Sequence, residues 1–184
     1  MSELAWVVGQ DEGQFFERKS CYDRSGGRVK PRPVRDAARD VAETLAAMAN
    51  ADGGTLVVGL EDSGGVSGVP YPADRLKVLR DAPLTHVRPP LKARLQEGTL
   101  QGKNLLLYEV DWSGEVHQLT DGRYVLRVGD QNLPFPASDI EAMKEAKRRR
   151  VTESRFVGEA SLDDLDLVLV ARLARPGEPA EAPE

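Results

Sequence analysis

The sequence is poor in the residues that build disulfides, zinc sites and histidine-dependent catalytic sets. Its 184 residues include one cysteine, Cys21, and two histidines, His86 and His117. One cysteine cannot form an internal disulfide, and one cysteine with two isolated histidines does not supply a zinc ligand set. Neither histidine belongs to a recognisable Ser/His/Asp set. Any metal ion would therefore have to be held by oxygen ligands.

Long apolar runs, aromatic residues and a nucleotide-binding P-loop are also missing. No apolar stretch is long enough to span a bilayer, and the first residues lack the basic start and apolar run of a signal peptide. We therefore expect a cytoplasmic protein with no membrane partner. Aromatic residues make up 5% of the chain, which argues against a broad base-stacking platform. Without a Gly-x-x-x-x-Gly-Lys-Ser/Thr pattern, Gly53 and Gly54 predict a helix end and a strand entry, although exposed amides there could also bind a phosphate.

The net charge of −5 arises entirely in the C-terminal part of the chain. From Glu153 to Glu184 there are eight acidic and three basic residues, whereas residues 1–152 carry twenty-two of each sign. A neutral body can still have one basic face, so the acidic balance does not exclude a nucleic-acid partner.

Hydrophobic periodicity predicts a single α+β domain, with a mixed β-sheet flanked by helices. Apolar residues recur at helical spacing from Val34 to Ala49, and Thr55 to Leu60 is a short apolar run typical of a central strand buried on both faces. Further helices are expected at Ala73–Asp81 and Ser138–Arg149, the second beginning with a Ser138/Glu141 capping box. Further strands are expected at Phe15–Lys19, Leu91–Gln96, Asn104–Val110 and Arg123–Val128.

The chain is expected to divide into three segments. Residues 1–152 form the folded domain, 153–175 a C-terminal helical extension, and 176–184 a disordered tail of Pro, Glu and Ala without aromatic residues. Ser161 is placed to cap the extension helix, whose apolar stripe needs a covering surface. The stripe could pack back on the body, join two subunits into a homodimer, or lead into another domain.

Three separated motifs give the chain its resemblance to a known family. They are Glu17-Arg18-Lys19, then Ala-Asn-x-x-Gly-Gly-Thr-Leu-x-x-Gly-Leu-Glu-Asp from Ala49 to Asp62, then Tyr-x-x-Arg-Val-Gly from Tyr124 to Gly129. In this order they resemble the AlbA_2 domain of the Schlafen superfamily over roughly Glu12 to Ala142. The resemblance implies either a nucleic-acid-binding module, as in bacterial transcriptional regulators, or a Schlafen-type RNA endonuclease.

The nuclease alternative would use carboxylates on a divalent ion. In Schlafen-type nucleases two acids come from a Glu-x-x-x-x-Glu motif and the third follows a Gly-Val-type strand; the matching residues here are Glu12, Glu17, and Glu61 or Asp62. The Gly-Leu-Glu-Asp at this strand end departs from the commoner Gly-Val-Asp-Asp, which leaves the third ligand open. Three carboxylates could hold Mg²⁺ or Mn²⁺, with Lys19 stabilising charge on the phosphate. Alternatively, these carboxylates are simply solvated.

The binding alternative would use basic side chains on the phosphates of DNA or RNA. The candidates are Arg18, Lys19, Arg28, Lys30, Arg32, Arg35 and Arg127. Several lie between Cys21 and Pro33, a segment rich in Gly, Pro and basic residues that predicts an exposed, mobile loop. Arg127 could contact phosphate or pair with an acid. A third hypothesis is a protein-interaction module that dimerises through the C-terminal helix.

Overall fold

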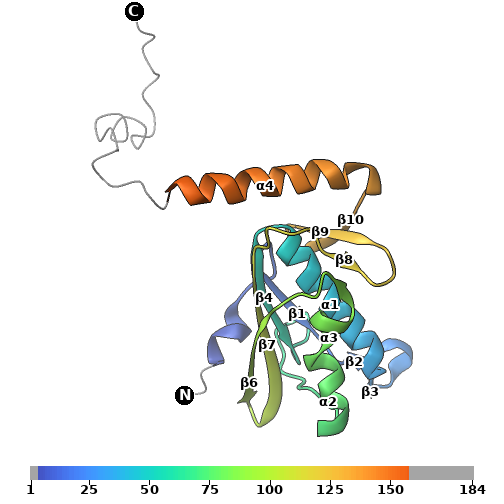
Figure 1. Cartoon of the computed structure of the whole chain (residues 1–184). Coiled ribbons are helices and arrows are strands. Elements are labelled where there is room, and N and C mark those ends of the chain that lie inside the picture. The colour runs from blue at the N-terminus through green and yellow to red at the C-terminus, as the bar shows by residue number, and fades with distance from the viewer. Residues whose placement is uncertain (1–3, 158–184) are drawn as a thin grey trace, which may run out of the picture. The chain divides into compact units, whose positions relative to one another are not determined.

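A computed structural model describes residues 4–157 and has an α+β fold with two four-stranded β-sheets (Figure 1). The first sheet has the order β1-β4-β7-β6. Its strands are β1 (Phe16–Lys19), β4 (Gly53–Val58), β7 (Lys103–Asp111) and β6 (Arg94–Leu100). Strand β1 is parallel to β4, whereas β7 pairs antiparallel with both β4 and β6. The expected mixed sheet is therefore confirmed.

Strand β4 lies inside the sheet because its side chains can be buried on both faces. Leu56 and Val58 pack in the cluster on the α1 side, whereas Val57 packs in a second cluster on the other side. Gly59, just after β4, has φ of +107°, and a Cβ there would lie 3.1 Å from the backbone of Gly68. Only glycine tolerates this conformation and this approach, so it lets the chain leave the sheet in a tight turn.

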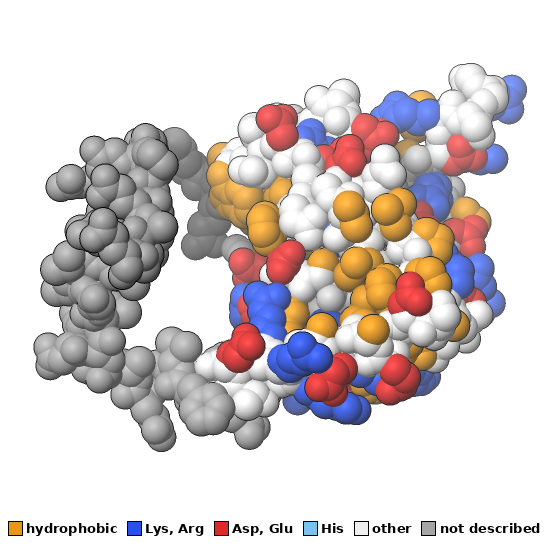
Figure 2. Space-filling view, turned by 90° about the horizontal axis from the view of Figure 1, so that it is seen from above, with side chains coloured by type: hydrophobic (Ala, Val, Ile, Leu, Met, Phe, Trp, Pro, Cys, Tyr) orange, Lys and Arg blue, Asp and Glu red, His pale blue; other side chains and the backbone are white. Residues whose placement is uncertain are grey.

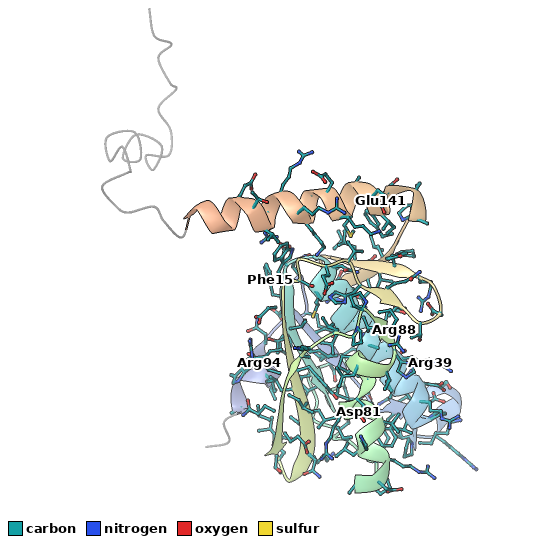
Figure 3. All side chains as sticks on the ribbon, in the orientation of Figure 1. Phe15, Arg39, Asp81, Arg88, Arg94 and Glu141 are labelled. Atoms are coloured by element: carbon teal, nitrogen blue, oxygen red, sulfur yellow. The ribbon has the colours of Figure 1, made fainter. Side chains whose placement is uncertain are left out.

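Helix α1 (Val34–Asn50) confirms the helix expected from the apolar stripe. Val41, Leu45 and Met48 are fully buried, and burial of each such side chain contributes about 1.5–3 kcal/mol. Helices α2 (Ala73–Arg80) and α3 (Ala82–Thr85) pack on the same side of the molecule. Side chains fill the space between these helices and the strands (Figure 3).

The second sheet has the order β10-β9-β8-β5 and is antiparallel throughout. Its strands are β10 (Gln131–Phe135), β9 (Tyr124–Val128), β8 (Gln118–Leu119) and β5 (Val87–Arg88). Asn50 at the end of α1 ties the helix to this sheet. Its amide donates to the carbonyls of His117 (2.8 Å) and Val125 (2.9 Å) and accepts from the His117 N–H at 2.8 Å.

The segment expected to be a mobile loop instead contains a two-stranded hairpin. Strands β2 (Tyr22–Asp23) and β3 (Lys30–Pro31) pair antiparallel around the 3₁₀ turn η2 (Ser25–Gly27). The Tyr71 hydroxyl donates to the Arg32 carbonyl at 3.0 Å and fastens the hairpin base to the body. Two-residue strands are too short to show an alternating pattern, which explains why the sequence indicated a loop.

A short N-terminal segment covers the face of the first sheet that α1 leaves open. The 3₁₀ helix η1 (Ala5–Gly9) supplies Val7, which is buried with Leu4 and Phe16 in the second cluster. The Trp6 ring packs on Phe16 with ring centroids 5.9 Å apart. The blue ribbon in Figure 1 shows this segment on the opposite side of β4 from α1.

The chain continues through η3 (Ala137–Asp139) into α4 (Ile140–Val157). Ser138 lies in η3 and donates its hydroxyl to Asp139, so the expected capping box is not formed. The division of the chain into units falls after Lys147, within α4. The expected extension helix near Ser161 and the expected tail at 176–184 lie outside the described residues. None of the helices in the described part of the chain has the length and apolar character needed to cross a membrane.

Candidate nucleic-acid interface

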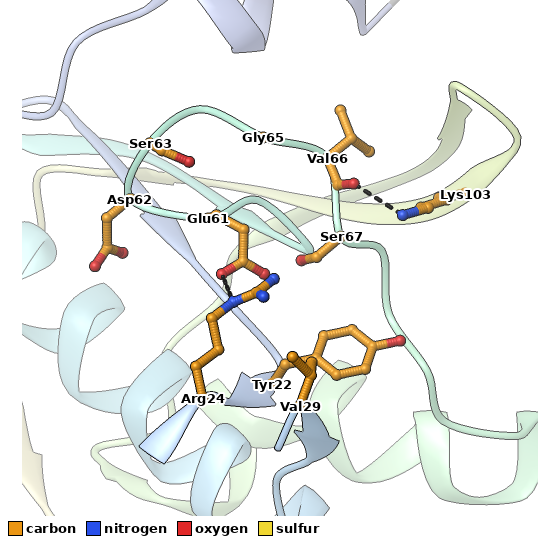
Figure 4. Close-up of a pocket in the computed structure, with 10 residues that line it drawn as sticks. All are labelled: Tyr22, Arg24, Val29, Glu61, Asp62, Ser63, Gly65, Val66, Ser67 and Lys103. Carbon is orange, nitrogen blue, oxygen red and sulfur yellow. Dashed lines mark hydrogen bonds and ion pairs between the residues drawn. The ribbon is translucent and has the colours of Figure 1, made fainter. Parts of the chain in front are cut away.

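A pocket of about 620 Å³ opens beyond the end of β4. Its walls come from the β2–β3 hairpin, the turn that follows β4, and the start of β7 (Figure 4). The residues that line it are Tyr22, Arg24, Val29, Glu61, Asp62, Ser63, Gly65, Val66, Ser67 and Lys103. Its size lies within the range of about 300–1,000 Å³ common for ligand sites, and its charged lining consists of two cations and two anions.

An ion pair between Arg24 and Glu61 crosses this pocket. The Arg24 Nε lies 2.8 Å from the Glu61 Oε2, and the Ser20 hydroxyl donates to the Glu61 Oε1 at 2.7 Å. Hydrogen bonding from Arg24, with a further hydrogen bond from the Ser20 hydroxyl, lowers the pKa of Glu61 to about 2. Glu61 is therefore a carboxylate at neutral pH, and the Arg24 guanidinium is held by an internal anion.

The other two charged groups of the pocket are more open. The Lys103 Nζ donates to the Val66 carbonyl at 3.1 Å, and the lysine itself is exposed. Asp62 is exposed on the turn and makes no hydrogen bond or ion pair with another described residue. Figure 4 shows Asp62 and Lys103 on opposite sides of the Arg24–Glu61 pair.

The hairpin and the residues next to it carry most of the basic side chains expected to contact phosphates. Lys30 pairs with Asp23 at 3.4 Å and Arg32 with Asp40 at 2.6 Å. Arg28 and Arg35 are exposed and have no partner among the described residues. Arg28 and Lys30 are carried by the hairpin but do not line the pocket, and Lys30 lies with Asp23 on the face opposite Tyr22. The Arg32 guanidinium is already engaged by Asp40.

Arg127 is placed differently from the expectation that it contacts phosphate. Its side chain is 1% exposed, and its Nη1 lies 2.7 Å from the Oε2 of Glu17, which is 6% exposed. The guanidinium also donates to the Gly13 carbonyl at 2.8 and 3.1 Å and to the Asn132 Oδ1 at 3.0 Å. A side chain so enclosed cannot reach a phosphate on the surface, so Arg127 has a structural role.

Arg18 is also buried, on the opposite face of β1. Its guanidinium donates to the Gln10 carbonyl and its Nε lies 3.8 Å from the Glu12 carboxylate. The alternation along β1 explains the placement, because Glu17 and Lys19 share the α1 side and Arg18 shares the other side with Phe16. Lys19 reaches the surface but pairs with the Glu17 Oε1 at 3.0 Å. Arg18 therefore also departs from the expected phosphate contact.

The four candidate metal ligands do not gather at one point. Glu12 and Glu17 are neighbours, and burial of Glu12, with the nearby Glu17 charge, raises the pKa of Glu12. Both Glu17 oxygens face cations, and Glu61 is held by Arg24 in the pocket. In the part of the chain that the structure describes, no group of three His, Cys, Asp or Glu side chains could hold a metal ion. The residues as arranged therefore do not fit a shared Mg²⁺ or Mn²⁺.

The surface seen in Figure 2 carries charge of both signs. Lys and Arg side chains alternate there with Asp and Glu around a group of hydrophobic side chains. The residues coloured in that view form no continuous basic patch on this face.

The model of the Schlafen, AlbA_2 family matches residues 12–136, which is more than half of the chain. The chain belongs to the Schlafen AlbA_2 family. Membership relates this AlbA_2 domain to nucleic acid without specifying regulation or cleavage. The matched region includes the whole pocket and the three ion pairs formed by Glu17 and Glu61.

Two solved structures resemble the AlbA_2 domain. The DIP2311 protein from Corynebacterium diphtheriae, known from a crystal structure, has 24% sequence identity to this chain and a TM-score of 0.58. The match covers 79% of this chain and 28% of that one, and it shows a shared fold. The N-terminal domain of a RecG-related protein from Nitrosomonas europaea is 23% identical with a TM-score of 0.43, over 61% of this chain and 75% of that one. The chain thus spans less than a third of the Corynebacterium protein. No curated protein matches the chain significantly.

The two cations of the pocket, Arg24 and Lys103, were not among the candidates named from the sequence. Arg24 lies in the same basic segment as Arg28 and Lys30, and its position two residues after Tyr22 places it at the pocket wall. Lys103 comes from the start of β7, about forty residues further along than Glu61, and no local signal connects the two. Only the β4–β7 pairing brings them together.

Proposed function

We propose that this AlbA_2 domain binds nucleic acid through the β2–β3 hairpin and the rim of the adjoining pocket. The observation that carries the proposal is the local density of exposed cations. Residues 21–33 contain four basic residues and one acidic residue in a chain whose net charge is −5. Arg24, Arg28 and Lys30 are all exposed on this hairpin, and Lys103 lies across the pocket from it.

Phosphate contacts account for such a site better than base-specific contacts do. Arginine and lysine neutralise phosphates and release condensed counterions, which supplies most of the affinity of non-specific binding. Arg28 has no partner among residues 4–157, so binding a phosphate does not require it to break a pair within that part of the chain. Tyr22 offers one aromatic ring at the pocket, which is enough for a single base and not for a stacking platform.

Fluorescence anisotropy with labelled duplex DNA, single-stranded DNA and single-stranded RNA tests the proposal between 50 and 200 mM salt. We expect affinity to fall as salt rises. For the variant Arg28→Ala/Lys30→Ala, the slope of log affinity against log salt should shrink by about 1.8 for a duplex, because each lost phosphate contact changes it by about 0.9.

The matched control is Arg75→Ala/Lys92→Ala. It removes two exposed cations that neither belong to the hairpin nor line the pocket, so it changes the net charge equally. We expect it to leave the salt slope nearly unchanged. Binding that does not respond to salt, or equal losses in the two double variants, would refute the proposed interface.

A role in transcription requires a further property of the same interface. The domain would have to prefer duplex DNA of particular sequence over the other probes, by base contacts that add to the phosphate contacts. A competition assay with random-sequence duplex measures this preference. Equal affinity for every duplex would leave a non-specific binding module.

The cleavage hypothesis can be tested with the same protein. Labelled RNA is incubated with Mn²⁺ or EDTA and analysed on a denaturing gel, using Glu12→Gln and Asp62→Asn as variants. Glu17 is avoided because its replacement would leave Arg127 buried without its anion. Cleavage that requires the metal and both carboxylates would identify a nuclease, whereas intact RNA that still binds would leave the binding function.

A further inference from the structure

We propose that Glu61 acts as an internal competitor of phosphate for Arg24, so that nucleic acid engages the pocket by taking the Arg24 guanidinium away from Glu61. The inference rests on the proposed nucleic-acid interface and deepens it, because it makes Glu61 a residue that determines affinity rather than a metal ligand. The exchange needs only side-chain movement at the surface of the pocket.

The geometry at Arg24 is that of a guanidinium already binding an oxyanion. Its Nε lies 2.8 Å from the Glu61 Oε2, and a phosphate oxygen would take the same donors, since guanidinium groups bind carboxylate and phosphate in the same way. Arg24 lies on the same hairpin as the exposed Arg28 and Lys30, and unlike them it lines the pocket, so a phosphate that enters the pocket meets Arg24. Figure 4 shows Arg24 reaching from the hairpin to Glu61 across the pocket.

Both partners can separate without leaving a buried charge unpaired. The Arg24 side chain is 53% exposed and can turn toward solvent or a ligand. Glu61 is 17% exposed, and after the exchange it would keep the hydrogen bond from the Ser20 hydroxyl at 2.7 Å. The Ser20 hydroxyl therefore holds the carboxylate in place when the arginine leaves.

The Arg127–Glu17 pair has the same chemistry and cannot exchange. Its arginine is 1% exposed and its glutamate 6% exposed, so breaking it would strand two charges in the interior. Comparison of the two pairs shows why only the Arg24–Glu61 pair is suited to competition. The exchange should favour ligands that bring a phosphate into the pocket over anions that only approach the hairpin.

The test is the affinity of Glu61→Gln for labelled nucleic acid at 100 mM salt. Glutamine keeps the size of the side chain and can still accept the hydrogen bond from Ser20, and it removes the competing charge. We expect binding about two- to fivefold tighter than that of the wild type, the factor that corresponds to the usual strength of an exposed ion pair. Arg24→Ala should abolish this gain when it is combined with Glu61→Gln.

Glu97→Gln is the matched control because it loses the same charge. Glu97 pairs with Arg80 at 2.5 Å outside the pocket, so its replacement should leave affinity nearly unchanged. Glu61→Asp is the second variant, because it withdraws the carboxylate from Arg24 while keeping the net charge, and it should also bind more tightly. Melting curves establish that each variant is folded.

The outcomes separate the two proposals. Salt-dependent binding by the wild type that Glu61→Gln leaves unchanged or weaker would refute the competition and retain the interface. A gain that persists in the Arg24→Ala background, or that Glu97→Gln reproduces, would come from the change in net charge. Either result would also refute the competition. If neither the wild type nor Glu61→Gln binds any of the probes, the interface and the competition both fail.

Discussion

Replacing Arg127 by alanine should destabilise the domain without specifically weakening nucleic-acid binding. The guanidinium holds three elements together: it pairs with Glu17 on β1, donates twice to the Gly13 carbonyl before β1, and reaches Asn132 on β10. Asn132 in turn donates to the Thr44 hydroxyl on α1 at 3.1 Å. Removal of this one side chain therefore takes a donor from the half-buried Gly13 carbonyl and Asn132 side chain, and leaves the buried Glu17 carboxylate with Lys19 alone.

The expected cost follows from what remains around Glu17. Breaking a buried ion pair by removing one partner typically costs about 3–5 kcal/mol, and we expect about 3 kcal/mol here because Lys19 still lies 3.0 Å from the other Glu17 oxygen. For a chain of this length, that loss lowers the midpoint of thermal unfolding by about 6–12 °C. Urea denaturation followed by circular dichroism measures the free energy of unfolding directly.

A double variant separates the pair from the cavity that alanine leaves. Arg127→Met/Glu17→Gln removes both charges and keeps most of the volume, so it should recover a large part of the loss. Affinity for nucleic acid should be measured at a temperature where Arg127→Ala is folded, and it should match that of the wild type. A loss of unfolding free energy below about 1 kcal/mol, or a fall in affinity with normal stability, would refute the structural role. Arg127 would then be a candidate for direct contact with nucleic acid.

Three further predictions concern other parts of the molecule. Burial lowers the pKa of His117 despite its hydrogen bond to Pro89, so the neutral form is favoured in the folded state. The contribution of His117 to stability should therefore be complete above pH about 6.5 and fall as the pH drops below it. Urea denaturation at several pH values should show this loss in the wild type and in the control His86→Gln, but not in His117→Gln. Burial raises the pKa of the Cys21 thiol to about 12, so a thiol reagent should label the native protein far more slowly than the urea-unfolded protein, and equal rates would contradict its burial. If the apolar stripe expected at 161–173 joins two subunits, light scattering should show a homodimer for the full chain and a monomer for a truncation after residue 157. A monomeric full chain would contradict this.

The sequence predicted the central architecture because the strongest signals coincide with long, deeply buried elements. The stripe from Val34 to Ala49 indicated a helix with one apolar side, and the β-branched, glycine-flanked run from Thr55 to Leu60 indicated a strand covered on both faces. Strands of two residues, such as β5 and β8, give no periodic signal and were not foreseen. β10 was also missed, because Pro134 and the short polar start of the strand hide its pairing with β9.

The candidate site was only partly predictable, because its residues meet through pairings distant in sequence. The basic segment at 21–33 was recognised as a cluster of cations, yet its fold as a hairpin depends on contacts with Tyr71 and the turn after β4. Lys103 reaches the pocket only through the order of the first sheet. Conversely, a motif that contains Glu17 and one that contains Arg127 suggested surface chemistry, whereas the two residues bind each other in the interior.

The two arginine–glutamate pairs, Arg127–Glu17 and Arg24–Glu61, differ in burial and not in residue type. Each joins a motif residue to a partner far along the chain, and each has a short contact of 2.7 or 2.8 Å. Composition and spacing cannot separate them, because the same two side-chain types form both. Burial separates them: an enclosed pair loses too much solvation on opening to serve a ligand, whereas a half-exposed pair can exchange one oxyanion for another. We therefore expect a ligand to bind at the Arg24–Glu61 pair and not at the Arg127–Glu17 pair.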